Sequence, residues 1–360
     1  MFVLRQALPQ DLDDLHSLAK QTFFINLPPD REIIAGKIEQ SEASFASLAS
    51  KDKKSAKRPS GSFGSGIRAV TGNSDLFLFV LEDTEGGGGI IGTSQVVAHM
   101  GGKGEPRVFL KLTNMTRESK SLKLKWTHLM AKVETDESGP TEIGGLILNH
   151  AFRGHKLRLG RFLSFARFHL IGLHRRRFAA RIVAEMLGPI DKNGYNPFFE
   201  KFTRHFIPRS FPEVYKFSQT SKEFVTGLMP PDWIDLSIMD PEVASSASAV
   251  GDGTLPARKM LERLGFESND RIDPLDGGPH LEARTDAIHL VKNTQPLSSI
   301  SAGARKTKNA DLILSALNPN GSFRAVQTSG IISGHKASVP AEALRALQSL
   351  DGSLGGTSLA

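Results

Sequence analysis

The chain of 360 residues contains no cysteine. This absence excludes disulfide bonds, thiolate metal ligands and a cysteine nucleophile, so the chain itself offers no covalent thiol chemistry. No apolar run approaches the ~20 residues that a membrane-spanning helix needs, and the N-terminal segment carries acids where a signal peptide would be apolar. We therefore expect an untargeted, cytoplasmic protein.

Aromatic residues are also scarce, at 7% of the chain with two Trp and two Tyr. The net charge of +7 is compatible with nucleic acid, a membrane surface or small anionic ligands as partners. No helix-turn-helix, zinc-finger or RNA-recognition signature accompanies the charge, so neither nucleic acid nor membrane is the expected partner. The scattered histidines show no HExxH or similar spacing, and we expect no metal.

Periodicity predicts strands and helices that alternate along the chain, which is the mark of a mixed α+β (α/β) fold. LFLFVLED at 76–83 and the run after the GGGG turn predict a β-hairpin, and residues 107–133 predict two more antiparallel strands. Asp11 is the candidate N-cap of a helix, and Gly265 is the candidate C-cap of the helix LPARKMLERLGF.

Composition divides the chain into a large domain over 1–294, a linker over 295–309 and a small β-rich C-terminal subdomain over 310–360. The large domain contains a Ser/Gly/Lys-rich stretch, at about 50–74, which we interpret as a flexible insert. The last residues, DGSLGGTSLA, are expected to be a disordered tail.

A basic, glycine-bearing loop follows the strand TEIGGLIL and precedes a long helix. Backbone N–H groups at such a helix start attract phosphate, and glycine lets the backbone come close to it. The residues concerned are Arg153, Gly154, Lys156, Arg158, Gly160 and Arg161. The alternative is a basic turn that only caps a helix on a solvated surface. The spacing fits neither a P-loop nor a GxGxxG dinucleotide loop.

This loop resembles the RxxGxG-type pyrophosphate loop of the GNAT acetyltransferases, with its spacing stretched. In that superfamily the preceding strand, here EIGGLIL, pairs with the pantetheine arm of the acyl-CoA. The resemblance implies a GNAT-like N-acyltransferase fold with a central, mostly antiparallel sheet for residues 1–294.

Four ordered segments resemble the arginine N-succinyltransferase family more specifically: RIVAEMLGPIDKNGYNPFFEKFTRHF, SKEFVTGLMP, LPARKMLERLGF and DGGPHLEARTDAI. The resemblance covers about residues 1–290. It implies transfer of succinyl from succinyl-CoA, as a co-substrate rather than a permanent cofactor, to the α-amine of L-arginine in arginine catabolism. It also implies that Leu146 contacts succinyl-CoA, although a core strand would contain the same residue.

One catalytic position departs from the family, because the place of its proton-donor histidine falls on Gly251. Glu185, in VAEM, and His280, in DGGPHLEAR, are the candidate catalytic residues that remain. A buried carboxylate is costly unless paired or functional, whereas a turn histidine is more often solvated. The candidate ligands for arginine are Asp276, Glu282 and Arg284.

Three functions therefore stay open. The first is an arginine N-succinyltransferase; the second is a catalytically impaired acyl-CoA or amino-acid binding or regulatory subunit; the third is an N-acyltransferase for a different amine. The oligomeric state is open between a homo-oligomer and a hetero-oligomer.

Overall fold

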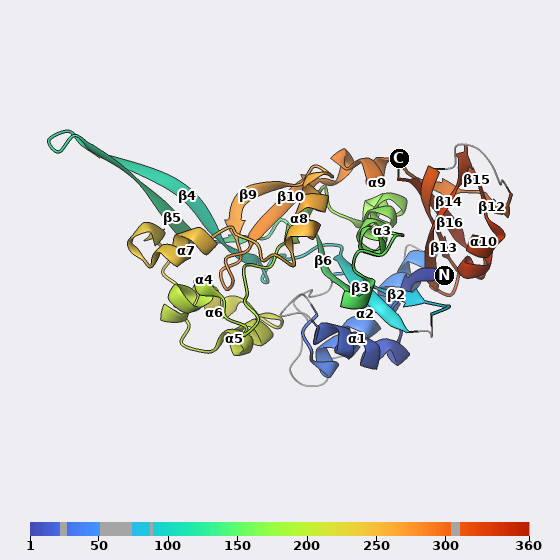
Figure 1. The fold of residues 1–360 in the computed structure, drawn as a ribbon, viewed down its shortest axis with the longest axis horizontal. Coiled ribbons are helices and arrows are strands. Elements are labelled where there is room, and N and C mark those ends of the chain that lie inside the picture. The colour runs from blue at the N-terminus through green and yellow to red at the C-terminus, as the bar shows by residue number, and fades with distance from the viewer. Residues whose placement is uncertain (22–26, 51–73, 87–88, 304–309, 360) are drawn as a thin grey trace. The chain divides into compact units, whose positions relative to one another are not determined.

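The chain forms two compact units in the computed structural model, which describes residues 1–21, 27–50, 74–86, 89–303 and 310–359. The first unit consists of Met1–His99, Ile143–Ala180 and Arg284–Ala360, and the second consists of Met100–Glu142 and Arg181–Ala283. Figure 1 labels the elements of both. None of the helices in the described ranges is long and apolar enough to cross a bilayer.

The first unit is built on strands that run in the order β11-β16-β13-β14-β1-β2-β3-β6. Its strands are β1 (Phe2–Gln6), β2 (Leu76–Asp83), β3 (Ile90–Val97), most of β6 (Thr141–Leu148), β11 (Thr294–Leu297), β12 (Ser299–Ala302), β13 (Ala310–Leu317), β14 (Phe323–Ser333), β15 (Lys336–Val339) and β16 (Ser353–Ser358). Its helices are α1 (Leu12–Ala19), α2 (Arg31–Ala49), α3 (Leu159–Leu173), α9 (His289–Lys292) and α10 (Ala341–Leu347).

An aromatic cluster fills the core between α2 and this sheet. The ring of Phe45 packs edge-on against Phe77 and Phe79 and stacks on Phe323, with centroids 5.1 to 5.6 Å apart. All four side chains are buried. Because each ring removes a large apolar surface from water, this cluster ties β2, β14 and α2 into one core.

The C-terminal tail is ordered, and the expectation of a disordered tail was wrong. Residues Ser353–Ser358 form β16, which lies between β11 and β13 and pairs antiparallel with both. A Cβ on Gly355 would lie 2.4 Å from the side chain of Leu173, and one on Gly356 would lie 2.9 Å from that of Ile332. The glycines therefore serve close packing here, whereas composition alone indicated flexibility.

The predicted domain boundaries do not coincide with the two units. β14 pairs with β1 at Val3, Leu4 and Arg5, so the chain after residue 310 shares a sheet with the N-terminus. The described part of the expected linker forms β11 and β12. The expected flexible insert lies, apart from its end residues, outside the described part of the chain.

The second unit contains strands in the order β6-β7-β10-β9-β4-β5-β8, with only the first two residues of β6 taking part. Its strands are β4 (Arg107–Ser119), β5 (Leu124–Asp136), β7 (Arg181–Glu185), β8 (Ile234–Asp235), β9 (Glu267–Ile272) and β10 (Pro279–Arg284, whose last residue belongs to the first unit). Its helices are α4 (Pro197–Lys201), α5 (Phe211–Ser218), α6 (Glu223–Leu228), α7 (Pro241–Ser246) and α8 (Leu255–Glu262).

Several local expectations are confirmed. β2 and β3 form the predicted hairpin, and β4 and β5 pair over their full length. Gly265, with φ +89°, follows α8 as a C-cap requires. Together with antiparallel registers in nearly every strand pair, this arrangement confirms the mixed α+β class with a mostly antiparallel sheet.

Asp11 behaves differently from a typical N-cap. It precedes α1, but its side chain makes no capping hydrogen bond to that helix. Its carboxylate instead accepts two hydrogen bonds from Arg5, at 2.7 and 2.8 Å, and one from the amide of Leu8. A partly buried cation within reach offers the carboxylate a stronger partner than a helix amide does.

Candidate functional site

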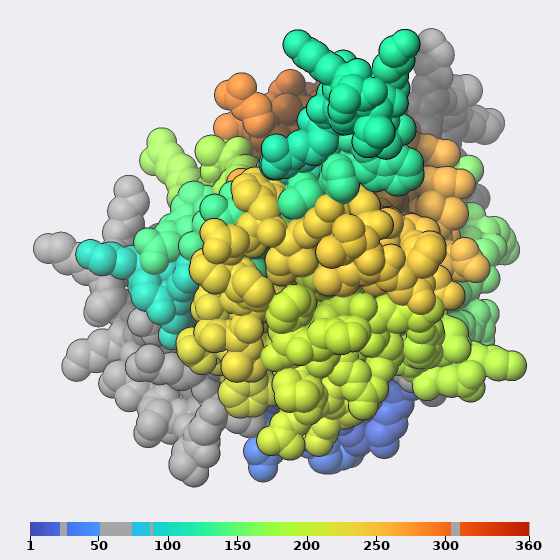
Figure 2. Space-filling model, turned by 90° about the vertical axis from the view of Figure 1, so that its left-hand side faces the viewer, coloured from blue at the N-terminus to red at the C-terminus, as the bar shows by residue number. Residues whose placement is uncertain are grey.

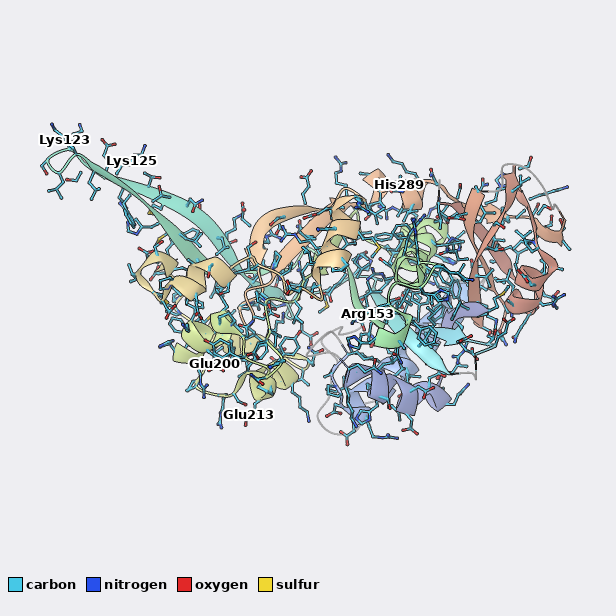
Figure 3. The ribbon with its side chains drawn as sticks, in the orientation of Figure 1. Lys123, Lys125, Arg153, Glu200, Glu213 and His289 are labelled. Atoms are coloured by element: carbon cyan, nitrogen blue, oxygen red, sulfur yellow. The ribbon has the colours of Figure 1, made fainter. Side chains whose placement is uncertain are left out.

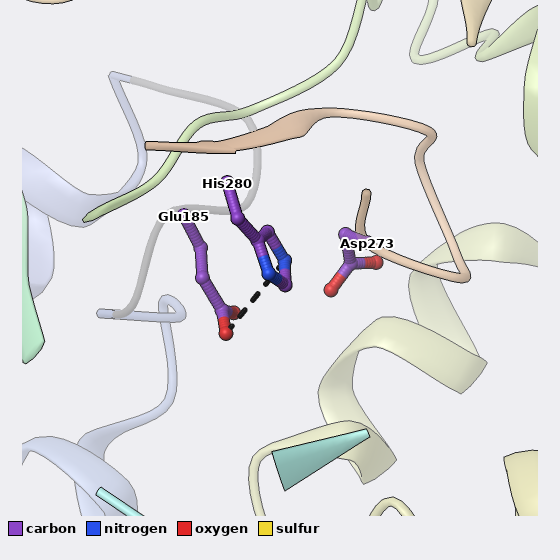
Figure 4. A group of neighbouring side chains, drawn as sticks. All are labelled: Glu185, Asp273 and His280. Carbon is purple, nitrogen blue, oxygen red and sulfur yellow. Dashed lines mark ion pairs between the residues drawn. The ribbon is translucent and has the colours of Figure 1, made fainter. Parts of the chain in front are cut away.

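A buried cluster of charged side chains lies in the second unit, where β7 ends and β10 begins. Glu185 is the last residue of β7, and His280 is the second residue of β10. The amide of Met186 donates to the carbonyl of Pro279 at 3.0 Å, which holds the two strand ends together. Figure 4 shows the imidazole of His280 between the carboxylates of Glu185 and Asp273. The structure thus brings together the two residues that were predicted to be catalytic.

Glu185 is surrounded by cations. Its carboxylate accepts a hydrogen bond from Arg107 at 2.9 Å, and the ammonium of Lys222 lies 3.5 Å away. Burial alone would raise the pKa of Glu185, but the charges of Lys222, of His280 once it is protonated at low pH, and of Arg107 lower it well below the ordinary value of 4.5. Its side chain is 17% exposed. Glu185 is therefore a permanently ionised carboxylate that solvent can still reach.

His280 is fully buried and lies behind Glu185. Burial lowers its pKa from 6.5 to about 4, so the ring is neutral near pH 7. Its Nδ1 lies 3.4 Å from Nη2 of Arg107, which can only donate, so Nδ1 accepts and the ring proton sits on Nε2. That Nε2 lies 3.8 Å from Glu185 and has no hydrogen-bond partner in the described part of the chain.

Three members of the cluster were not anticipated from the sequence: Arg107, Lys222 and Asp273. Lys222 bridges two carboxylates, because its Nζ lies 3.1 Å from Asp273 and 3.5 Å from Glu185. Asp273 also accepts a hydrogen bond from the amide of Leu275. Arg107 starts β4, far from the other members in sequence. Only the position of Lys222 in SKEFVTGLMP, one of the segments that resemble the family, could have pointed to it.

The same cluster has the residue types of a metal site. Single ligand atoms of Glu185, Asp273 and His280 lie within 4.8 Å of one another. However, the ammonium of Lys222 already stands between the two carboxylates, and Arg107 occupies one oxygen of Glu185. A divalent cation would have to displace or repel these two charges, so the donor set fits internal ion pairing better than metal binding.

The expected ligands for arginine do not form one group. Asp276 is buried, and its Oδ1 accepts from the amides of Gly188 and Gly278 at 3.2 and 2.7 Å. Burial, followed by the charge of Asp273, raises the pKa of Asp276 well above 3.8. Its contacts are those of a residue that orders a loop.

Glu282 is paired with two arginines, Arg181 at 3.1 Å and Arg271 at 3.2 Å. Arg284 is exposed and belongs to the first unit, whereas Asp276 and Glu282 belong to the second. Sequence proximity thus suggested a common site for side chains that make separate contacts.

Position 251 has room for a side chain. Gly251 has no left-handed backbone strain, and a Cβ there would meet only backbone atoms of Gly188, Pro189 and Ile190, at 3.5 Å or more. Gly188 also donates to Asp276, so position 251 adjoins the loop that follows β7. A Cβ there is sterically admissible, so the backbone does not require glycine at this position.

The basic loop of the first unit has the form expected for an anion site. Gly154 adopts φ +75°, and Arg158 adopts φ +52° immediately before α3. α3 has no side-chain cap at its start, so amides of its first turn point outward without a side-chain acceptor. Arg153, Lys156 and Arg158 are exposed around this point. Figure 3 labels Arg153 on this loop.

Three other residues predicted for this site lie on α3 and β6. Arg161 donates to the carbonyl of Leu359 at 3.4 Å and lies over the ring of Phe165 at 5.1 Å. Gly160 lies in the first turn of α3, and Leu146 is a half-buried residue of β6. β6 pairs with β7 at Thr141 and Glu142, and Leu146 lies further along β6, past this pairing.

A sequence model described as "Arginine N-succinyltransferase beta subunit" matches residues 2–290. The chain belongs to this family. An arginine N-succinyltransferase from Photorhabdus laumondii is 32% identical over 278 residues, which cover 77% of this chain and 80% of the relative. Another from Yersinia enterocolitica is 29% identical over 297 residues, which cover 82% of this chain and 79% of the relative.

A solved structure shares the fold of the family member described here. It is the arginine/ornithine succinyltransferase subunit AI of Pseudomonas aeruginosa, with a TM-score of 0.77 over 100% of this chain and 99% of that one. Its sequence identity is 24%. The family predicted from the four sequence segments is confirmed, and the fold of the whole chain, including the ordered C-terminal strands, has a structural counterpart.

Proposed function

We propose that this chain is an arginine N-succinyltransferase that transfers the succinyl group of succinyl-CoA to the α-amine of L-arginine. The observation that carries the proposal is the family match over residues 2–290. In the reaction the amine nitrogen forms an amide bond with the succinyl carbonyl, and the carbonyl–sulfur bond breaks. Coenzyme A leaves as a thiol with the proton that the nitrogen loses. No covalent enzyme intermediate is needed, in keeping with a chain that lacks cysteine.

The basic loop before α3 supports the acyl-CoA part of the proposal. Its exposed cations Arg153, Lys156 and Arg158 and the free amides of the helix start suit the pyrophosphate of coenzyme A. Leu146 on β6 would lie along the pantetheine arm. Charge reversal at Lys156 and Arg158 is therefore expected to weaken binding of coenzyme A, measured by calorimetry.

Glu185 and His280 act as a pair in this proposal. Glu185 stays ionised at every ordinary pH and is reachable from solvent, so it suits a cationic group of arginine as a ligand. His280 is buried behind it, and its Nε2 proton faces the same carboxylate. His280 thus positions Glu185, and Glu185 touches the substrate.

Neither member of the pair has a pKa near neutrality, which an efficient general base requires. Catalysis then depends on holding the two reactants together, which by itself lowers barriers by several kcal/mol. A histidine at position 251 would add a group that titrates near pH 6.5. Gly251→His is therefore expected to raise kcat, by up to ~10²-fold if it transfers a proton.

The deciding experiment measures thiol release from succinyl-CoA with and without L-arginine. Arginine-dependent release from the wild type supports the proposal. Glu185→Gln is expected to raise KM for arginine by about 10- to 100-fold, the loss of one hydrogen bond to a charge. His280→Leu is expected to raise KM less. Glu267→Gln, an exposed carboxylate of the same unit, is the matched control and leaves both constants unchanged.

A second function is favoured by one observation, the glycine at position 251. In this alternative the chain binds acyl-CoA but does not turn it over, as a binding or regulatory subunit would. Binding of coenzyme A together with no arginine-dependent thiol release, until Gly251→His restores it, would establish this alternative. Release with another amine but not with arginine would instead indicate a different acceptor.

A further inference from the structure

The hairpin of β4 and β5 extends well beyond the sheet that anchors it. β4 pairs with β9 at Leu110 and Lys111, and β5 pairs with β8 at Met130 and Ala131. From residue 115 to residue 127, among the described strands, the two strands pair only with each other. We call this segment, 115–127, the arm; Figure 1 shows it projecting from the rest of its unit. Two-stranded ribbons are at best marginally stable in water alone.

Apolar side chains of the arm are turned to solvent. Leu122, Leu124 and Trp126 are 74%, 53% and 58% exposed. Of the eleven large apolar side chains that are exposed in the described chain, nine belong to the second unit. A contiguous group of this kind on a projecting element is typical of a surface that another molecule covers, and an exposed tryptophan is the residue most often central to such contacts.

The arm is also strongly basic. It carries four cations and one anion: Arg117, Lys120, Lys123, Lys125 and Glu118. None of these cations takes part in an ion pair with the rest of the described chain. Figure 3 shows Lys123 and Lys125 at the far end of the hairpin. The molecule that covers the arm is therefore expected to be acidic as well as apolar.

The second unit itself presents such a surface. The segment Phe211–Glu242, which includes α5 and α6, contains six acids and two lysines. Asp235 pairs with His128, and Asp240 and Glu242 pair with Lys201. The exposed carboxylates outside these pairs are Glu213, Glu223 and Asp232. Three of its large apolar residues, Phe217, Leu228 and Ile238, are more than half exposed. Figure 2 shows the arm and this helical segment on one face, with the arm uppermost. We call this segment the acidic surface.

We propose that the arm of one copy of this chain packs on the acidic surface of a second copy, and that the contact is exchanged reciprocally in a dimer. Figure 1 shows the arm pointing away from α5 and α6 of its own unit, so it reaches these two helices of the acidic surface only in another molecule. A reciprocal exchange uses one kind of contact twice and closes with two-fold symmetry. Such a dimer buries the arm's apolar group and neutralises its charge together.

Sedimentation velocity of the full chain over a range of concentrations tests this proposal. The wild type is expected to dimerise reversibly. The variant Leu122→Ser/Leu124→Ser/Trp126→Ser is expected to raise the dimer Kd by about 30-fold or more, the usual effect of removing central apolar anchors. Ile331→Ser, an exposed apolar residue of the first unit, is the matched control and leaves the Kd unchanged.

A charge exchange tests the identity of the two contacting surfaces. The arm variant Lys120→Glu/Lys123→Glu/Lys125→Glu and the surface variant Glu213→Lys/Glu223→Lys/Asp232→Lys should each associate weakly alone. Mixed together they should form a heterodimer, because each arm then meets a surface of opposite charge. Lys20→Glu/Lys336→Glu, a change of exposed charges in the first unit, should leave association as in the wild type.

Two results would overturn the proposal. One is a wild-type chain that stays monomeric at its highest workable concentration. The other is a dimer whose Kd the arm variants leave unchanged, or two charge variants that do not associate when mixed. Circular dichroism and thermal unfolding of each variant verify that the fold is retained, which keeps a folding failure apart from a lost contact. The result does not depend on the proposed enzymatic function.

Discussion

Each of the two units buries a histidine completely, but the two histidines have different surroundings. In the first unit, His169 contacts two hydroxyls, Thr357 at 2.6 Å and Ser315 at 2.7 Å, so both ring nitrogens are satisfied. In the second unit, His280 lies among charged groups and its Nε2 has no partner in the described chain. A buried polar group whose hydrogen bonds are all made stabilises the fold, whereas a buried polar group with an unsatisfied donor points to function.

The largest expected effect on stability comes from the charged cluster around His280. Lys222→Met leaves Asp273 and Glu185 without their shared cation and is expected to cost about 3 to 5 kcal/mol of unfolding free energy. Urea denaturation measures this loss. Lys201→Met is the matched control, since Lys201 also bridges two carboxylates, Asp240 and Glu242, but at the surface. An equal loss in both variants would contradict the role of burial.

The next prediction compares the two histidines directly. His169→Leu removes the hydrogen-bond partner of two buried hydroxyls and is expected to lower the free energy of unfolding by about 1 to 3 kcal/mol. His280→Leu breaks no hydrogen bond at Nε2 and is expected to cost less than about 1 kcal/mol. Unfolding titrations of both variants at pH 7 check the order. A larger loss in His280→Leu would mean that its contact with Arg107 is the dominant structural interaction.

A smaller effect is expected in the pH dependence of stability. Burial, with the charge of His174, lowers the pKa of His169 from 6.5 to about 3. Below pH 6.5 the unfolded chain therefore binds a proton at His169 that the folded chain does not bind. The free energy of unfolding falls as the pH drops through this range. Between pH 6 and pH 4, His169→Leu should flatten this slope by about 1 kcal/mol per pH unit. Unchanged slopes would show that His169 is not the group responsible.

The smallest effect is expected for an exposed ion pair of the first unit. Arg175 pairs with Asp286 at 2.5 Å, but the carboxylate is 71% exposed. Asp286→Asn is expected to cost only ~0.2 to 1 kcal/mol, because solvent screens the pair. A thermal shift of a degree or two would agree with this size, while a cost near that of Lys222→Met would remove the distinction between surface and buried charge.

Local patterns in the sequence predicted much of the fold. The hairpin of β2 and β3 follows from an apolar run and a glycine turn, and α8 follows from its period and from Gly265. The tail was predicted wrongly, because composition cannot show that Gly355 lies against Leu173. Asp11 was expected to cap a helix, but its side chain pairs with Arg5, and the sequence pattern does not show that these two side chains meet.

The candidate site was predictable only in part. Glu185 and His280 stand in segments that resemble the family, and the fold brings them together. Arg107 and Lys222 reach them from distant parts of the chain, so no spacing rule relates them. Asp273 lies in the loop just before β10, outside the segments that resemble the family. The charges of Arg107 and Lys222 decide the ionisation of Glu185, so the low pKa of this carboxylate could not be predicted from local sequence patterns.

The placement of β16 has a consequence for biosynthesis. This strand is the last described strand in sequence order and lies between β11 and β13 in the sheet of the first unit. That sheet cannot be completed until residues 353–358 have been synthesised, whereas β1 is the first of its described strands in sequence order. The second unit, whose segments end at Ala283, has all of its sequence earlier. Synthesis therefore favours completion of the second unit first, and the first unit acquires β16 only afterwards.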